Sequence, residues 1–203
     1  ITMGPPAAEA VLRECLAVGC DRAILVTDRA FGNADTLATS YSIVSAANLI
    51  DKFDLIFCGK ETLDGATGQM GAQLAEGFDA AQITSASHIM KIDTLVVERE
   101  LETGIETLEV TTPCLFTMEK THYPVRIPNL KGKMAAKKAK IITLTANDIP
   151  GLDRARIGDP GSPTKVPRMF PPIMPEPGVI LDEGSVDKTV GKLFGLLAAD
   201  GCI

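Results

Sequence analysis

The residues best suited to chemistry lie in the stretch from Asp54 to Gln73, which reads DLIFCGKETLDGATGQMGAQ. Its apolar run 55–58 predicts a strand buried on both faces, and a helical pattern resumes near Gln69. The first N–H groups of a helix lack intrahelical partners, and the helix dipole favours negative charge there. Gly65 and Gly68 have no Cβ, so a phosphate could approach the loop backbone closely. The stretch therefore predicts a site for the phosphates of a nucleotide.

The glycine spacing leaves a second interpretation open. Gly65, Gly68 and Gly71 follow neither the dinucleotide pattern G-x-G-x-x-G nor a Walker A loop, so an ordinary surface loop explains the residues equally well. Asp64 could bind a ribose hydroxyl or simply hold the turn. His88 and His122 are isolated, and neither a Gly-x-Ser-x-Gly elbow nor a Cys/His pairing indicates a nucleophile. The residues alone therefore leave both interpretations open, and we expect no catalytic side chain and no metal site.

Composition limits the class of protein. The 203 residues are 45% apolar, which suffices for one α/β domain with an appendage. A net charge of −6 and an aromatic content of 4% argue against nucleic-acid binding. No apolar run approaches the ~20 residues that span a bilayer. The five cysteines form no C-x-x-C pair, which indicates reduced thiols in a cytosol-like compartment, not a disulfide framework or a zinc site.

The elements that position the loop alternate between strand and helix. Strands are expected at residues 1–4, 23–26 and 55–58, each followed by a helical pattern. This alternation predicts a doubly wound parallel sheet, in which ligands lie beyond the carboxyl ends of the strands. The loops 3–6, 27–35 and 59–69 meet that condition.

The remainder of the chain has another pattern. Short alternating segments at 86–92, 95–100 and 106–111 predict strands with a hairpin turn at 102–105, and further strands are expected at 113–118 and 141–144. In the polar loop before the lysine-rich segment 131–140, Ile127 is either an exposed anchor for a partner protein or a buried residue that pins the loop. Residues 150–178 hold eight prolines and four glycines and are expected to form an extended arm, followed by an amphipathic helix over 186–199. We expect an α/β domain over 1–145 and an arm with a terminal helix over 146–203.

Several motifs, taken in order, resemble the β subunit of an electron-transfer flavoprotein. They are the segments 3–6, 59–69, 97–108, 113–118 and 123–129 with the lysines that follow. The resemblance implies an adenine-nucleotide-binding α/β fold, in a heterodimer with an α subunit that holds its own FAD. It also implies that the family's N-terminal strand–helix portion is absent from this chain.

The same resemblance implies two contacts with other proteins. The loop that docks onto a flavin-dependent dehydrogenase matches Tyr123, Ile127, Pro128 and Asn129, with Ile127 in the place of the apolar anchor. The arm and the last helix resemble the segment that wraps the α subunit. The protein is expected in the cytoplasm of a bacterium or an archaeon.

The family has two branches, which differ in the nucleotide of the β subunit. One branch holds a structural AMP and relays electrons from acyl-CoA-type dehydrogenases. The other holds a second FAD that accepts hydride from NADH and splits the electron pair, with ferredoxin or flavodoxin as a possible acceptor. Residues 27–40 resemble the FAD branch, and the run after Asp64 lacks the acidic residues typical of the AMP branch. Carboxylates beside a diphosphate would repel it, so FAD is favoured.

The resemblance also implies the residues that bind the cofactor. They are Met3, Gly4, Asp28, Thr36, Thr39, Ser40, Gly59, Asp64, Gly65, Ala66, Thr67, Gly68, Gln69 and Met70. Backbone N–H groups of 65–70, the Thr67 hydroxyl and the Gln69 side chain would hold the phosphates, while the flavin carries the chemistry. An alternative of another class is a regulatory module that binds ATP without redox chemistry.

Overall fold

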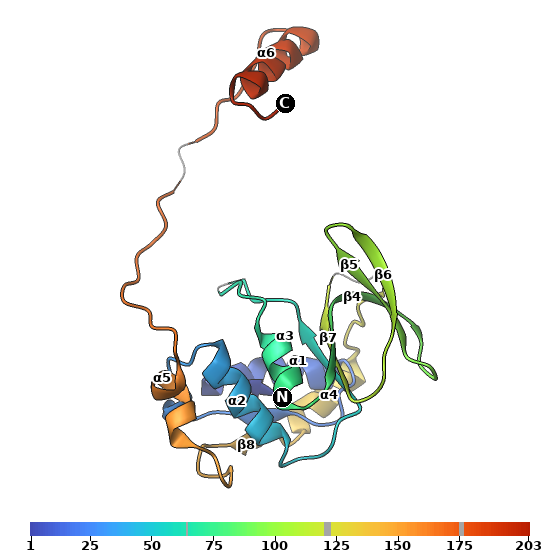
Figure 1. The fold of residues 1–203 in the computed structure, drawn as a ribbon, viewed down its shortest axis with the longest axis vertical. Helices are drawn as coiled ribbons and strands as arrows, with labels where there is room; N and C mark the ends of the chain where they lie inside the picture. The colour runs from blue at the N-terminus through green and yellow to red at the C-terminus, as the bar shows by residue number, and fades with distance from the viewer. Residues whose placement is uncertain (64, 120–122, 175–176) are drawn as a thin grey trace. The chain divides into compact units, whose positions relative to one another are not determined.

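The structure is a computed structural model that describes residues 1–63, 65–119, 123–174 and 177–203. The chain divides into two compact units. The first unit comprises residues 1–165 and carries the β-strands found among the described residues, while the second comprises residues 166–203 (Figure 1). Among the described residues, no helix has the length and apolar character needed to cross a membrane.

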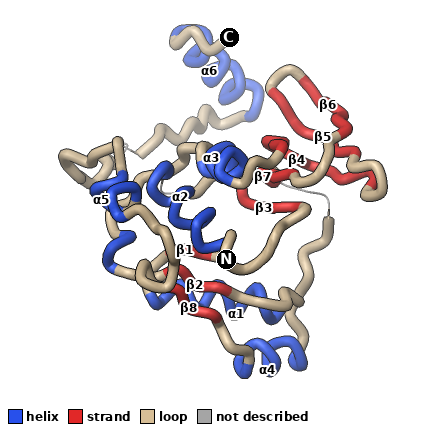
Figure 2. The backbone as a smooth tube through the Cα atoms, turned by 60° about the horizontal axis from the view of Figure 1, so that its bottom comes forward, coloured by secondary structure: helices blue, strands red, loops and turns tan. Residues whose placement is uncertain are grey.

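A three-stranded parallel sheet forms one part of the first unit. Its strand order is β1 (Thr2–Met3), β2 (Ile24–Val26) and β8 (Ile142–Leu144), which lie side by side in Figure 2. The short 3-10 helix η1 (Pro6–Ala8) leads from β1 into α1 (Glu9–Ala17), and Pro6 at its start has no N–H to leave unpaired. Helix α1 packs against α4 (Leu130–Lys138) around Leu12, Leu16 and Ala136.

A five-stranded sheet forms the other part. Its order is β3 (Leu55–Gly59), β7 (Cys114–Met118), β4 (Ala81–Lys91), β5 (Val96–Leu101) and β6 (Gly104–Glu109). Strands β3, β7 and β4 are parallel, whereas β4, β5 and β6 are antiparallel and include the expected hairpin. Ile83, Val97 and Phe116 lie in the core of this sheet.

Helices α2 (Thr36–Ala47) and α3 (Met70–Gly77) pack on each other, and α3 also packs on β7. Two glycines permit these close approaches. A Cβ on Gly71 would lie 2.1 Å from Thr117 Cγ2, and one on Gly77 would lie 2.7 Å from Val44 Cγ2. Gly71, the second residue of α3, therefore permits the close packing of α3 on the sheet.

The expectation that residues 55–58 are buried on both faces is wrong. Strand β3 is an edge strand that pairs only with β7 among the described residues, and Phe57 is 51% exposed. The α/β class with parallel strands is confirmed, but a single doubly wound sheet is not, because the strands divide into two sheets.

The expected boundary at residue 146 also differs from the structure. Residues 146–165 belong to the first unit, where they form η3 (Arg154–Arg156) and α5 (Gly158–Gly161). Ile157 is only 2% exposed and lies in a core cluster with Val26 and Phe31. The prolines led to the expectation of an arm over 150–178, but residues 150–165 of that segment belong to the α/β unit, and Ile157 lies in its core. The second unit begins at Val166 and ends in α6 (Val186–Ala199).

Candidate nucleotide-binding site

The loop 59–69 leaves β3 at Gly59 and enters α3 at Met70. Thr62 holds its turn, because its hydroxyl accepts a hydrogen bond from Gly65 N (3.3 Å) and its carbonyl accepts one from Ala66 N (2.9 Å). The described residues from 59 to 69 are all exposed. Asp64, which was expected to bind the cofactor, lies outside the described residues.

Two residues of the loop have a left-handed backbone conformation. Gly68 has a φ of +61°, and Ala66, which is not a glycine, has a φ of +45°. An L-residue in this region costs about 1–2 kcal/mol, because its Cβ crowds the following carbonyl. Such strain is retained most often where a backbone serves a ligand.

The start of α3 differs from the start of α2 in its capping. Asp35 caps α2 by accepting a hydrogen bond from Ala38 N at 3.0 Å. The residue in the same position at α3, Gln69, makes no side-chain capping bond. Among the described residues no side chain is found to cap α3, and a helix start of this kind can bind an anion.

The side chain of Gln69 instead links the two helices. Thr36 Oγ1, in the first turn of α2, donates a hydrogen bond to Gln69 Oε1 at 3.0 Å. Both residues were expected to bind the cofactor from different segments, and the structure brings them together at an exposed position. The loop and the start of α2 thus form one candidate site.

The side chains of two other expected site residues, Asp28 and Ser40, form hydrogen bonds with groups of the protein itself. Asp28 Oδ1 accepts a hydrogen bond from Ala30 N (3.0 Å), and its Oδ2 accepts one from Ala146 N (3.1 Å). These two N–H groups, that of Ala30 first, lower the pKa of the Asp28 carboxyl below its usual 3.8. The buried Ser40 hydroxyl donates to Leu37 O at 2.9 Å. Asp28 caps η2 (Arg29–Phe31) and fastens the loop after β8, while the Ser40 hydroxyl is used inside its own helix.

Three further expected residues lie near strand or helix ends. Met3 ends β1 and packs on the core cluster of Val26, and Gly4 N donates to Val26 O at 3.1 Å. Thr39 lies in the first turns of α2 and is half-buried. Among the described contacts, neither Met3 nor Thr39 has a side-chain hydrogen bond to the loop 59–69, and Gly4 has no side chain.

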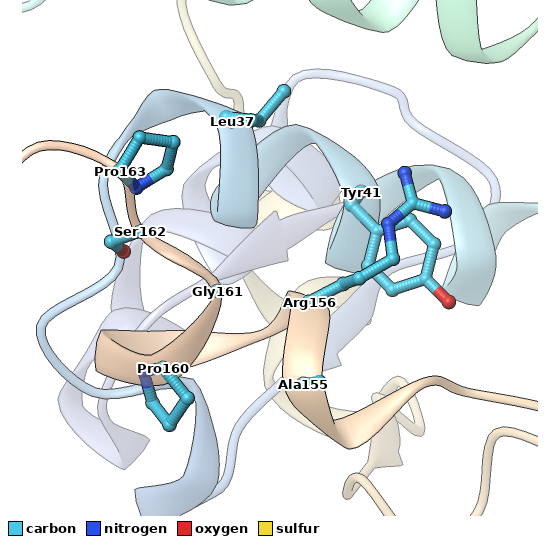
Figure 3. A pocket seen from close by; sticks show the side chains of 8 residues that line it. All are labelled: Leu37, Tyr41, Ala155, Arg156, Pro160, Gly161, Ser162 and Pro163. Atoms are coloured by element: carbon cyan, nitrogen blue, oxygen red, sulfur yellow. The ribbon is translucent and has the colours of Figure 1, made fainter.

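A cavity of about 270 Å³ adjoins the start of α2, as Figure 3 shows. Its lining residues are Leu37, Tyr41, Ala155, Arg156, Pro160, Gly161, Ser162 and Pro163. The Arg156 guanidinium carbon lies 4.0 Å from the centre of the Tyr41 ring. No expected cofactor residue lines this cavity, so it is a separate feature.

Asp35 ties the start of α2 to the segment that closes this cavity. Its Oδ2 accepts a hydrogen bond from Thr164 N (3.0 Å), and its own N–H donates to Ser162 Oγ (2.8 Å). Burial acts to raise the pKa of the Asp35 carboxyl, but the N–H groups of Ala38 and Thr164 outweigh it and lower the pKa. Sequence reasoning recognised Asp35 only as a helix cap, because no local pattern reveals a partner more than 120 residues away.

The loop 123–129 is fastened at both ends. Tyr123 Oη lies 3.0 Å from His88 Nδ1, accepts a hydrogen bond from Ile89 N and donates one to Ile89 O, both at 3.2 Å. Asn129 Oδ1 accepts a hydrogen bond from Gly132 N at 2.8 Å and so caps α4, a helix that the sequence analysis did not predict.

Between these ends Ile127 is 84% exposed, and Pro128 beside it is half-buried. The interpretation of Ile127 as a buried residue that pins the loop is therefore excluded.

An α/β fold with an uncapped helix start at the end of a parallel strand is the arrangement typical of nucleotide-binding proteins. The model of the family described as "Electron transfer flavoprotein domain" matches residues 1–149. The chain belongs to this family of electron carriers. Because the match begins at residue 1, it gives no support to the expectation that an N-terminal portion of the domain is absent.

The relatives agree with the family. The chain is 43% identical over 197 residues to the electron transfer flavoprotein subunit beta of Thermoanaerobacterium thermosaccharolyticum, covering 95% of this chain and 74% of that protein. It is 38% identical over 198 residues to the caffeyl-CoA reductase-Etf complex subunit CarD of Acetobacterium woodii, covering 97% and 75%. It is 39% identical over 180 residues to protein FixA of Bradyrhizobium diazoefficiens, covering 85% and 62%.

Proposed function

We propose that this chain is the FAD-binding β subunit of an electron-transfer flavoprotein of the bifurcating branch. The observation that carries the proposal is the Thr36–Gln69 hydrogen bond, which joins the start of α2 to the uncapped start of α3. A diphosphate at this point meets the N–H groups of residues 67–70 and the Thr67 hydroxyl.

The residues present fit a diphosphate in two respects. A Cβ on Gly68 would meet no atom within 4 Å, so the space beside the loop is open. Gly65, Ala66 and Thr67 bring no carboxylate to the loop, which favours the diphosphate of FAD over a site built for AMP. The flavin, when bound, supplies the redox chemistry, and this chain positions it.

The second unit is proposed to bind the α subunit. Large apolar side chains in it are exposed, namely Val166, Met169, Phe170, Ile173, Met174, Val179, Ile180, Val186, Val190, Leu193, Phe194 and Leu196. An apolar surface of this extent indicates a protein interface. The α subunit holds its own FAD in this proposal, which gives two flavins per heterodimer.

The exposed Ile127 is proposed to dock onto a flavin-dependent dehydrogenase. The name of CarD places that relative in a complex with caffeyl-CoA reductase, an enzyme of the acyl-CoA-linked kind, which supports a similar partner here. We propose NADH as electron donor, ferredoxin or flavodoxin as the low-potential acceptor, and the bacterial cytoplasm as the location.

The two sheets are proposed to be parts of one doubly wound sheet. Among the described residues β1 pairs only with β2, and β3 pairs only with β7, so each sheet has an open edge. Helix α2 contacts both β1 and α3, as a crossover between two parts of one sheet would. One further parallel strand between β1 and β3 would join them. Slow amide exchange at residues 55–59 in the purified heterodimer supports this, and fast exchange contradicts it.

The proposed function is tested on the heterodimer by extraction and quantification of its nucleotides. Two FAD per heterodimer support it. One FAD and one AMP would select instead a housekeeping flavoprotein that only relays electrons. A complex without flavin absorbance that binds ATP would indicate a regulatory module.

A further inference from the structure

Asp35, which caps α2, fastens that helix to a part of the chain near the end of the first unit. Its N–H donates a hydrogen bond to Ser162 Oγ at 2.8 Å, and its Oδ2 accepts one from Thr164 N at 3.0 Å. Its other carboxylate oxygen, Oδ1, caps the helix by accepting a hydrogen bond from Ala38 N. Ser162 and Pro163 lie beside the start of α2 in Figure 3. Asp35, Ser162 and Thr164 are called the clasp below.

The part of the chain that carries Ser162 also packs closely on the loop before α2. Ser162 is 3% exposed, and its hydroxyl donates a hydrogen bond to Gly158 O at 2.7 Å. Asp159 N donates one to Gly32 O at 3.0 Å. A Cβ on Gly158 would lie 2.2 Å from Ala30 O, so the glycine permits this approach. Backbone and side-chain contacts together therefore restrict the motion of the start of α2.

The clasp lies directly beside the candidate nucleotide-binding site. Thr36 follows Asp35 in the sequence, and its Oγ1 donates the hydrogen bond to Gln69 Oε1. Helix ends fray unless they are held, so the position of the Thr36 hydroxyl depends on what fixes the first turn of α2. A group that is held in place before a ligand arrives loses less conformational entropy when the ligand binds. The clasp can therefore affect ligand binding through Thr36 without touching the ligand.

The charge of Asp35 argues against a direct contact between its side chain and a phosphate. A carboxylate repels a phosphate at close range, and the Asp35 carboxylate already occupies the start of α2. Both carboxylate oxygens and the N–H of Asp35 form hydrogen bonds with groups of the protein. Asp35 is thus suited to hold the helix start, not to contact a nucleotide.

We propose that Asp35, Ser162 and Thr164 are positioning residues of the nucleotide-binding site. They fix the first turn of α2, so that the Thr36 hydroxyl and the Gln69 side chain stay together and receive the diphosphate of FAD with little further ordering. A clasp that only stabilised the fold would instead affect the free energy of unfolding and not the affinity for the ligand. The inference rests on the proposed function, because the ligand is the FAD proposed for the loop 59–69.

Two mild substitutions test the clasp in the full heterodimer. Asp35→Asn keeps an oxygen that can cap Ala38 N, but its amide nitrogen cannot accept the hydrogen bond from Thr164 N. Ser162→Ala removes the hydroxyl that accepts a hydrogen bond from Asp35 N. Each variant should raise the Kd for FAD about 5-fold, which corresponds to about 1 kcal/mol, when dialysed heterodimer is titrated with FAD. Loss of the Asp35 charge would by itself strengthen the binding of a diphosphate, so a fall in affinity supports positioning.

Matched controls change similar side chains outside the clasp. Asp153→Asn alters the cap of η3, where the Asp153 carboxylate accepts a hydrogen bond from Ala155 N. Ser45→Ala removes another hydroxyl of α2, which donates a hydrogen bond to Tyr41 O. Both controls should leave the Kd for FAD unchanged.

A double-mutant cycle shows whether the clasp acts through Thr36. The loss of affinity in Ser162→Ala/Thr36→Val should be smaller than the product of the two single losses, because both changes act on the same hydroxyl. Fully independent losses would overturn the inference and leave the proposed function standing. So would an unchanged Kd in both clasp variants, whether or not their free energy of unfolding falls. A wild-type heterodimer that binds only one FAD would overturn the proposed function, and the inference with it.

Discussion

Thr36 and Gln69 lie 33 positions apart in the sequence and are joined by a 3.0 Å hydrogen bond between Thr36 Oγ1 and Gln69 Oε1. The bond connects the first turn of α2 to the residue that precedes α3. Gln69 uses its side chain for this link and makes no capping bond to α3, and no cap of α3 is found among the described residues. This relationship is the basis for the first prediction.

Substitution of Thr36 by Val removes the hydroxyl and frees the Gln69 side chain. We expect the affinity for FAD to fall about 10-fold, because a hydrogen bond of this kind contributes about 1 kcal/mol and its loss also disorders the site. Titration of flavin-free heterodimer with FAD measures the effect. Thr36→Ser, which keeps the hydroxyl, should retain the affinity.

A double-mutant cycle with Gln69→Leu tests whether the two residues act together. The double variant should lose less affinity than the product of the single losses, since both single changes break the same bond. Independent, fully additive losses would contradict the coupling.

Substitution of Gly71 by Ala should destabilise the first unit. The added Cβ would lie 2.1 Å from Thr117 Cγ2, so α3 must move away from β7, and we expect a loss of about 1–3 kcal/mol in the free energy of unfolding. Urea unfolding followed by circular dichroism measures it. The control is Gly191→Ala in α6, where a Cβ meets no atom within 4 Å and should only raise helix propensity.

Substitution of Arg13 by Met should loosen the end of α4. Arg13 donates to the carbonyl groups of Ala136 and Ala139 and pairs with Glu9, so we expect a loss of about 1–2 kcal/mol and faster amide exchange in α4. Arg22→Met removes only an exposed pair with Asp51 at 3.6 Å and should cost less than about 0.5 kcal/mol. Equal effects of the two variants would show that the hydrogen bonds from Arg13 to the end of α4 contribute nothing.

Low pH should reduce the stability of the first unit, in part because the Asp28 carboxylate becomes protonated. Its pKa in the folded protein lies below the usual 3.8, so the folded state binds the proton less readily than the unfolded state. The stabilisation is therefore complete above pH 3.8 and is lost as the pH falls through the lowered pKa.

The variant Asp28→Asn tests this assignment. Its stability should depend less on pH below about 4 than that of the wild type in urea titrations at a series of pH values. An unchanged acid dependence would show that the Asp28 carboxylate does not contribute.

The sequence predicted much of the fold because the signals for individual elements are local. The apolar runs and helical patterns up to Gly77 place β1, β2, β3, α1, α2 and α3 within a few residues of their observed bounds. Helix α4 was missed because its lysines and its single buried residue, Ala136, give a weak apolar pattern. The cap at Asn129 was the available signal for that helix.

Long-range packing limited the remaining predictions. The burial of Ile157 beside Val26 and Phe31 depends on contacts across more than 120 residues, and no local pattern encodes them. Thr36 and Gln69 were predicted as site residues from the resemblance, and both stand where a strand and a loop lead into a helix. Asp28 was assigned to the cofactor from the resemblance, but its carboxylate is occupied by the N–H groups of Ala30 and Ala146.

The measurement that tests the central claim most directly is the nucleotide content of the purified heterodimer. Extraction followed by chromatographic quantification should give two FAD per heterodimer, and Thr36→Val should lower the count toward one after dialysis. One FAD per heterodimer in the wild type, with AMP or no nucleotide at the loop 59–69, would contradict the claim that this chain binds FAD.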